Sequence, residues 1–196
     1  MAIGTKHVLA LALAALAAAG CASAPARFYT LEATAIADGS ESASYGVIVG
    51  PVAVPASVDR PEFVVQSAPN QVTLDEFNRW ASPLEDAIAR TVAVDLATLL
   101  GTPRVATAPL ANFDPAYRVT IDVQRFDSIQ GDAALLDAVW VVHTTASGVT
   151  RSGRTVAREA VQGKGFDALA GAHSRALAQM SADIAGSIEA AAASGR

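Results

Sequence analysis

Residues 133–145, AALLDAVWVVHTT, decide the fold because apolar side chains occur on both of their faces. One set of alternate positions holds Leu135, Val139 and Val141, and the other holds Leu136, Trp140 and Val142. A strand that is apolar on both faces is typical of the centre of a sheet covered on both sides. The stretch therefore predicts a central strand with helices above and below its sheet.

Further strands are predicted on both sides of this stretch. Residues 117–124 alternate apolar and polar side chains, which is the pattern of a strand with one solvated face. The alternation shifts at Gln124 or Arg125, so we expect a bulge there. Residues 151–161 are polar at many positions and suit an edge strand. Together with the central stretch they predict a three-strand antiparallel meander.

Two helices are predicted by the spacing of apolar residues. The first starts at Ser82-Pro83-Leu84-Glu85, where Ser82 is the expected N-cap, and it stops at Gly101. The second is an Ala-rich C-terminal helix whose apolar positions run from Phe166 to Ile188. Both helices have one apolar face, so each is expected to pack on the sheet.

The chain before the first helix is mostly extended. Residues 47–55 are β-branched and uncharged, as in a buried strand, and residues 62–67 and 71–74 flank a turn signal and predict a hairpin. Residues 104–106 add a short strand. The predicted fold is α/β: a three-layer α/β/α sandwich with a mixed sheet of about five strands.

The N-terminus has the features of an export signal. A positive start at Lys6 precedes the uncharged apolar block 8–19, which is shorter than the roughly 20 residues that a membrane span needs. The sequence that follows, Leu16-Ala17-Ala18-Ala19-Gly20-Cys21, resembles the bacterial lipobox, in which the cysteine is joined to diacylglycerol and becomes the first residue. Cys21 is therefore the predicted lipidation site, and an ordinary secretory signal cut after Ala19 is the alternative.

These features divide the chain into three parts. Residues 1–20 are the predicted lipoprotein signal peptide, residues 21–45 the lipidated N-terminus and a Ser/Ala/Gly-rich tether, and residues 46–194 the folded domain. Ala22 follows the cysteine, where Asp tends to retain lipoproteins at the inner membrane. The lipobox resemblance therefore implies an outer-membrane location.

Composition excludes several classes of function. The net charge of −5 and the lack of a Lys/Arg run argue against nucleic acid or an anionic membrane surface as the main partner. Cys21 is the only cysteine, so an intramolecular disulfide and a cysteine-based zinc site are both excluded. No cofactor is predicted.

Catalytic signals are few. The three histidines are His7, His143 and His173, and a serine hydrolase using His143 lacks the Gly-x-Ser-x-Gly elbow. Asp75-Glu76 and Glu85-Asp86 are neighbouring pairs whose side chains point apart on a strand or helix. We therefore expect a non-catalytic protein.

Five short motifs resemble one family. They are the lipobox, Phe28-Tyr29-Thr30-Leu31, Val49-Gly50-Pro51-Val52-x-Val54-Pro55, Val58-Asp59-Arg60-Pro61 and Asn78-Arg79-Trp80-Ala81-x-Pro83-Leu84. In this order they resemble the PqiC-like ABC-type transport auxiliary lipoproteins. The resemblance implies a periplasm-facing outer-membrane lipoprotein that works with an MCE-domain protein and ABC transporter components to move phospholipid or another hydrophobic compound. It also implies a fold similar to the anticodon-binding-domain-like group and carries over no catalytic residue.

Two motifs suggest a partner-binding surface. Asp59, Arg60 and Pro61 form one expected part, and Arg79 and Trp80 the other. The alternative is that Arg79 pairs with an acid and Trp80 fills the core. An envelope hydrolase, a purely structural lipoprotein and a homo-oligomer also stay open from the sequence.

Overall fold

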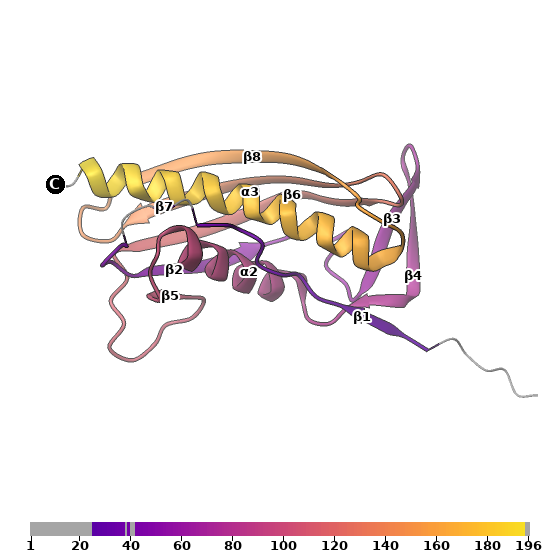
Figure 1. Ribbon diagram of the computed structural model, residues 1–196, viewed down its shortest axis with the longest axis horizontal. Helices are drawn as coiled ribbons and strands as arrows, with labels where there is room; N and C mark the ends of the chain where they lie inside the picture. Colours follow the sequence, from indigo (N-terminus) through magenta and orange to yellow (C-terminus); the bar gives the residue numbers. More distant parts are fainter. Residues whose placement is uncertain (1–24, 38, 40–41, 195–196) are drawn as a thin grey trace, which may run out of the picture.

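The computed structural model describes residues 25–37, 39 and 42–194, so the signal segment and Cys21 lie outside the described residues. None of the helices in these ranges is long and apolar enough to cross a membrane. The elements are β1 (Arg27–Tyr29), β2 (Val47–Ala53), β3 (Glu62–Ala68), β4 (Gln71–Trp80), α2 (Leu84–Leu99), β5 (Val105–Ala106), β6 (Tyr117–Ile129), β7 (Ala133–Thr144), β8 (Thr150–Ala160) and α3 (Gly165–Ser194) (Figure 1).

All the described strands belong to one mixed sheet of eight strands, and the expected number of about five is wrong. The long strand β6 explains the difference, because two strands share one of its edges. Its first half pairs in parallel with β2 and its last residues pair in parallel with β3. Strand β5 extends the sheet beyond β2, while β4 and β1 extend it beyond β3. The other edge of β6 carries the predicted meander of β6, β7 and β8.

Both helices cover the same face of the curled sheet, so the fold has two layers rather than the predicted three (Figure 1). Helix α2 packs on β2 and β5, α3 packs on β7 and β8, and the two helices contact each other. Nothing in this arrangement identifies the anticodon-binding-domain-like fold. The core fills the space between the helices and the sheet and includes the rings of Phe63, Trp80 and Phe126.

The outer face of the sheet is open to solvent, so the prediction that β7 is covered on both faces is wrong. Val139 is exposed and Val156 on β8 is 70% exposed. Charged side chains from the neighbouring strands stand beside the apolar ones on this face. The Arg154 guanidinium donates hydrogen bonds of 2.8 and 2.6 Å to Asp137 and thereby holds the pKa of that carboxyl below its usual range. Apolar residues on both faces of β7 indicate its central place in the sheet and not a second helical layer.

Several local predictions are confirmed. Strands β3 and β4 form the hairpin, with Asn70 at φ +60° in its turn. The register of β6 and β7 shifts between Val123 and Arg125, where the bulge was expected. Helix α2 ends before Gly101, whose φ of +59° favours glycine. Strand β8 pairs only with β7 and is an edge.

The predicted cap of α2 is wrong by one residue. Pro83 is the N-cap, and its carbonyl accepts the hydrogen bond of the Ala87 amide at 3.0 Å. The Ser82 hydroxyl instead accepts a 2.8 Å hydrogen bond from Arg90. Glu85 and Asp86 lie in the first turn, where their charge favours the helix dipole.

Residues 31–37, which we call the strap, run along both helices although they form no regular structure. The Glu32 amide donates to Ser174 Oγ on α3 at 3.1 Å, and the Ala35 amide donates to Asp95 Oδ1 on α2 at 2.9 Å. Before the strap, β1 pairs with β4. Contacts with the folded body therefore begin at Arg27, well before the start near residue 46 that the composition suggested.

Candidate functional site

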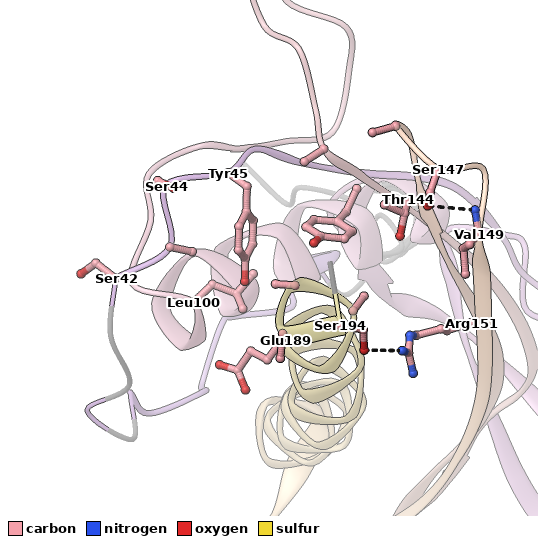
Figure 2. Close-up of a pocket in the computed structure, with 17 residues that line it drawn as sticks. Ser42, Ser44, Tyr45, Leu100, Thr144, Ser147, Val149, Arg151, Glu189 and Ser194 are labelled. Atoms are coloured by element: carbon pink, nitrogen blue, oxygen red, sulfur yellow. Dashed lines mark hydrogen bonds between the residues drawn. The ribbon is translucent and has the colours of Figure 1, made fainter. Parts of the chain in front are cut away.

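A wide groove opens at the end of the molecule where α3 terminates (Figure 2). Its walls come from the last turns of α3, the β6 and β7 ends, the β7–β8 turn, and residues 42–45. Its volume is about 1060 Å³. Pockets for drug-sized ligands usually measure about 300–1,000 Å³, so this groove has room for a large organic molecule.

Small side chains create this space. Ala191, Ala192 and Ala193 form the helical wall, and Ala116 and Ala146 contribute from the sheet side. Larger side chains at these positions would fill the same volume. The rings of Tyr45 and Tyr117 meet edge to face with centroids 5.0 Å apart. Leu100 adds another apolar surface near Tyr45 (Figure 2). The lining is thus mixed, with apolar and polar surface in nearly equal parts.

Polar groups lie at the rim of the groove. Arg151 Nη2 donates a 3.1 Å hydrogen bond to Ser194 Oγ, which ties β8 to the last turn of α3 (Figure 2). Among the described residues of the lining, Glu189 is the one acid and Arg151 the one base, and Ser and Thr hydroxyls complete the rim. An apolar wall beside hydroxyls and a single guanidinium suits an amphipathic molecule better than a highly charged one.

A second polar cluster is buried between the helices. Asp95 on α2 has no exposed surface, and it accepts hydrogen bonds from the Ala35 amide of the strap and from Ser181 Oγ on α3 at 3.2 Å. Burial raises the pKa of this carboxyl despite these donors. Because Asp95 joins the strap and both helices and faces no groove, its geometry suits packing rather than catalysis.

A buried serine–histidine pair was not foreseen from the sequence. Ser128 Oγ and His173 Nε2 lie 2.8 Å apart, between Phe126, whose ring stacks on the imidazole, and Trp80. Burial lowers the pKa of His173 to about 3, so the ring is neutral. Nδ1 has no hydrogen-bond partner in the described part of the chain. A hydrolytic triad needs a carboxylate at that nitrogen and access for substrate, and this pair has neither.

His143, the histidine of the hydrolase alternative, lies on the outer face near the end of β7. It is opposite Arg118 on β6 and Thr150 on β8. Within residues 42–194 its ring makes no hydrogen bond or ion pair, and no group of three or more metal-binding side chains gathers anywhere in the described chain. No observation favours hydrolysis at this position.

The structure brings the two predicted partner segments together. The Trp80 amide donates a 2.7 Å hydrogen bond to the Pro61 carbonyl, and Arg79 Nη2 lies 3.5 Å from Glu62 Oε1. The Trp80 side chain is buried and stacks on Phe63 with ring centroids 4.0 Å apart. Asp59, Arg60 and Pro61 are exposed beside it. The surface that these segments offer therefore consists of residues 59–61 and the half-buried Arg79, with Trp80 beneath.

Sequence reasoning missed the groove entirely. Its lining comes from five segments that are far apart in the chain, and most of these residues are alanine or serine. Such residues carry no chemical motif. The only available signal was the run of alanines at the end of the C-terminal helix.

Two solved structures share this fold. A crystal structure described as an uncharacterized protein is 23% identical to this chain, with a TM-score of 0.70 over 84% of this chain and 99% of that one. A crystal structure of a Xanthomonas campestris protein of the DUF330 family is 19% identical, with a TM-score of 0.66 over 81% of this chain and 92% of that one. No curated protein matches the chain.

The comparison with family models gives the family itself. The model described as the ABC-type transport auxiliary lipoprotein component matches residues 29–185, from β1 into the second half of α3. The matched range contains strands β2 to β8 and helix α2. The match confirms the resemblance to this family that the motifs indicated. The chain belongs to the family of ABC-type transport auxiliary lipoprotein components.

Proposed function

We propose that this protein is a non-catalytic lipoprotein of the outer membrane, anchored through Cys21 and facing the periplasm. In this proposal it assists an MCE-domain protein and ABC transporter components in moving phospholipid or another hydrophobic compound. The family match over residues 29–185 carries the proposal, since that family is described as an auxiliary lipoprotein component of ABC-type transport.

The groove supports a direct role with the transported compound. Its apolar lining of tyrosine, leucine and alanine side chains could bury part of an acyl chain, while the rim offers hydroxyls and Arg151 to a head group. The open groove of about 1060 Å³ has room for such a molecule, and this room favours a direct role over a purely structural one. For the partner surface, we propose Asp59, Arg60, Pro61 and Arg79, with Trp80 as their buried support.

The test is an affinity purification of the full-length protein from its own membranes. Mass spectrometry would identify the modification on Cys21, the accompanying proteins and any bound lipid. We expect an acylated cysteine, MCE-domain and ABC components, and a co-purifying phospholipid or similar amphiphile. An unmodified Cys21 without such partners would overturn the proposal.

Matched variants separate the groove from the partner surface. Ala146→Trp should fill the groove and reduce the bound lipid several-fold, because Ala146 lines it. Ala111→Trp is the control, since Ala111 is exposed and is not part of the lining. Equal lipid recovery from both variants would remove the groove from the proposal and favour the structural role.

A further inference from the structure

The β3–β4 hairpin carries apolar side chains that no described residue covers. Val72 is 60% exposed and Leu74 is 44% exposed on β4, and Phe77 is exposed as well. Val72 and Leu74 pair with Gln66 and Val64 of β3, so the two side chains share one face of the hairpin. Together they form what we call the hairpin patch, Val72 and Leu74.

The hairpin is also an open edge of the sheet. Strand β1 pairs only with residues 78–80 of β4, so residues 71–77 have a strand neighbour on one side alone in the described chain. Next to the patch is a hollow of about 230 Å³ whose lining includes Val58, Val64 and Val72. A two-residue apolar patch on an uncovered edge, beside a hollow whose lining is mixed polar and apolar, is a surface suited to contact with a partner.

The start of the fold lies at this same end of the molecule. Strand β1 runs beside the foot of β4 (Figure 1), and Phe28 of β1 is 64% exposed. The first residue of α3 with a large side chain, Phe166, contacts Tyr29 and Phe63 there, with ring centroids 6.0 and 5.1 Å apart. The hairpin, β1 and the beginning of α3 thus form one end, which we call the anchor end.

Only a short piece of chain separates the anchor end from the proposed lipid. Arg27 is six residues after Cys21, and six extended residues span at most about 20 Å. The strap is hydrogen-bonded to α2 and α3, so its residues do not lengthen this connection. A protein held by Cys21 therefore keeps Arg27, the start of the anchor end, within about 20 Å of the bilayer surface.

From this placement we propose that the hairpin patch rests in the head-group layer of the bilayer that holds the Cys21 acyl chains. The proposal rests on the lipid anchor of the proposed function and goes beyond it by assigning a second membrane contact. Phe28 adds to this contact from β1. The bilayer is favoured over a protein partner because the anchor brings a lipid surface to this end without any further binding event.

Polar groups limit how deeply the hairpin enters. Asp75 Oδ1 accepts hydrogen bonds from the Phe77 and Asn78 amides at 3.0 and 2.9 Å, and Glu76 is exposed next to it. The unpaired backbone groups of residues 71–77 would be costly in hydrocarbon. The contact is therefore shallow, with the apolar side chains at the boundary and the carboxylates among the head groups.

The experiment places a fluorescent probe on the patch of the acylated protein. Acylation blocks the Cys21 thiol, so Leu74→Cys supplies the only free thiol of the chain. The labelled full-length protein is inserted into vesicles of phosphatidylethanolamine and phosphatidylglycerol that contain nitroxide-labelled lipids. Leu110→Cys is the matched control, because Leu110 is an exposed leucine outside the hairpin and its mutation disturbs no core contact.

We expect at least two-fold stronger quenching at position 74 than at position 110, and stronger quenching by a nitroxide near the head group than by one deep in the acyl chain. Equal quenching at both positions in a preparation whose Cys21 is acylated would overturn the hairpin contact and leave the proposed function intact. No quenching at position 74, with an envelope protein bound there instead, would assign the patch to a protein partner and also overturn it. An unacylated Cys21 would overturn both proposals, and mass spectrometry of the same sample distinguishes these cases.

Discussion

At the scale of single residues, His173 makes the stability of the fold depend on pH. Its folded pKa of about 3 lies below the ordinary 6.5, so the unfolded chain binds a proton that the folded chain excludes. The contribution is complete above pH 6.5 and is lost as the pH falls toward 3. Between pH 7 and pH 5 this linkage costs about 2 kcal/mol of unfolding free energy.

The His173→Phe/Ser128→Ala double variant should lose that pH dependence. Removing Ser128's hydroxyl together with the imidazole avoids leaving a buried polar group without its partner. Urea unfolding should show that the free energy of unfolding decreases between pH 7 and pH 5 by about 2 kcal/mol less in the double variant than in the parent. His143→Gln is the control and should keep the full drop. If the double variant falls as steeply as the parent, His173 is not the titrating group.

Gly153 is the residue at which an added methyl group should do most harm. A Cβ there would lie 2.2 Å from Cζ2 of Trp140, whose indole N–H donates to Thr155 Oγ1 at 3.1 Å. Gly153→Ala should therefore lower the unfolding free energy by at least about 1–3 kcal/mol and change the tryptophan fluorescence.

Gly186→Ala in α3 is the opposite case, because nothing lies within 4 Å of its Cβ position. It should stabilise the protein by about 0.5–1 kcal/mol, and urea unfolding of the two variants checks both signs.

At the scale of elements, Asp95 couples the strap to the two helices. Its folded pKa is raised by burial, so its favourable contribution is present below the unfolded pKa of about 3.8 and is lost as the pH rises through the folded value. Asp95→Asn keeps an oxygen for the Ala35 amide, replaces the oxygen that faces Ser181 with an NH2 group that donates to the Ser181 hydroxyl, and carries no charge. The difference in unfolding free energy between this variant and the parent should therefore favour the variant more at pH 7 than at pH 4.

Denaturant unfolding at pH 7 and pH 4 gives that difference directly. If the two proteins differ in unfolding free energy by the same amount at pH 7 and at pH 4, Asp95 does not titrate differently in the folded and unfolded states. Asp95→Ala is a useful companion, because it leaves the Ala35 amide without an acceptor. In that variant hydrogen exchange of the strap, residues 31–37, should become faster than in Asp95→Asn.

Most elements could be predicted from the sequence, because alternation and helical spacing report which side of an element is buried. The meander, the hairpin and both helices followed from such patterns. The number of layers could not be predicted from such patterns. Apolar residues on the outer face of β7 are compatible either with a covering helix or with charged side chains from neighbouring strands, such as Arg154. The strap was hidden for another reason: its hydrogen bonds come from the amides of Glu32 and Ala35, and a backbone amide is the same in any sequence.

The candidate site was less predictable than the fold. Arg79 and Trp80 stood out as unusual residues, yet Trp80 is in the core and Arg79 lies near Glu62. The groove is built of ordinary residues from distant segments, and only the folded chain brings Tyr45, Tyr117 and Ala192 together. A motif can mark a residue type, whereas a cavity depends on what the neighbouring side chains leave empty.

At the scale of the whole molecule, α3 connects two ends with different surfaces. Phe166 contacts β1 and β3 at the anchor end, and Ser194 bonds to Arg151 in the groove wall. Its 30 residues extend about 45 Å. In the proposed orientation the hairpin patch faces the bilayer and the groove opens into the periplasm, where a partner protein could reach it.

Under the proposed function, this length sets an energetic condition on the amphiphile that the groove would bind. An amphiphile in a groove about 45 Å from the anchor end has left the bilayer completely, because the head-group layer on each side is only about 5–8 Å thick. Withdrawing an acyl chain of about 15 methylenes into water costs about 12 kcal/mol. Thermal extraction by this protein alone would therefore be extremely slow, and its groove would have to be loaded by a partner that keeps the chain out of water or spends ATP to lift it.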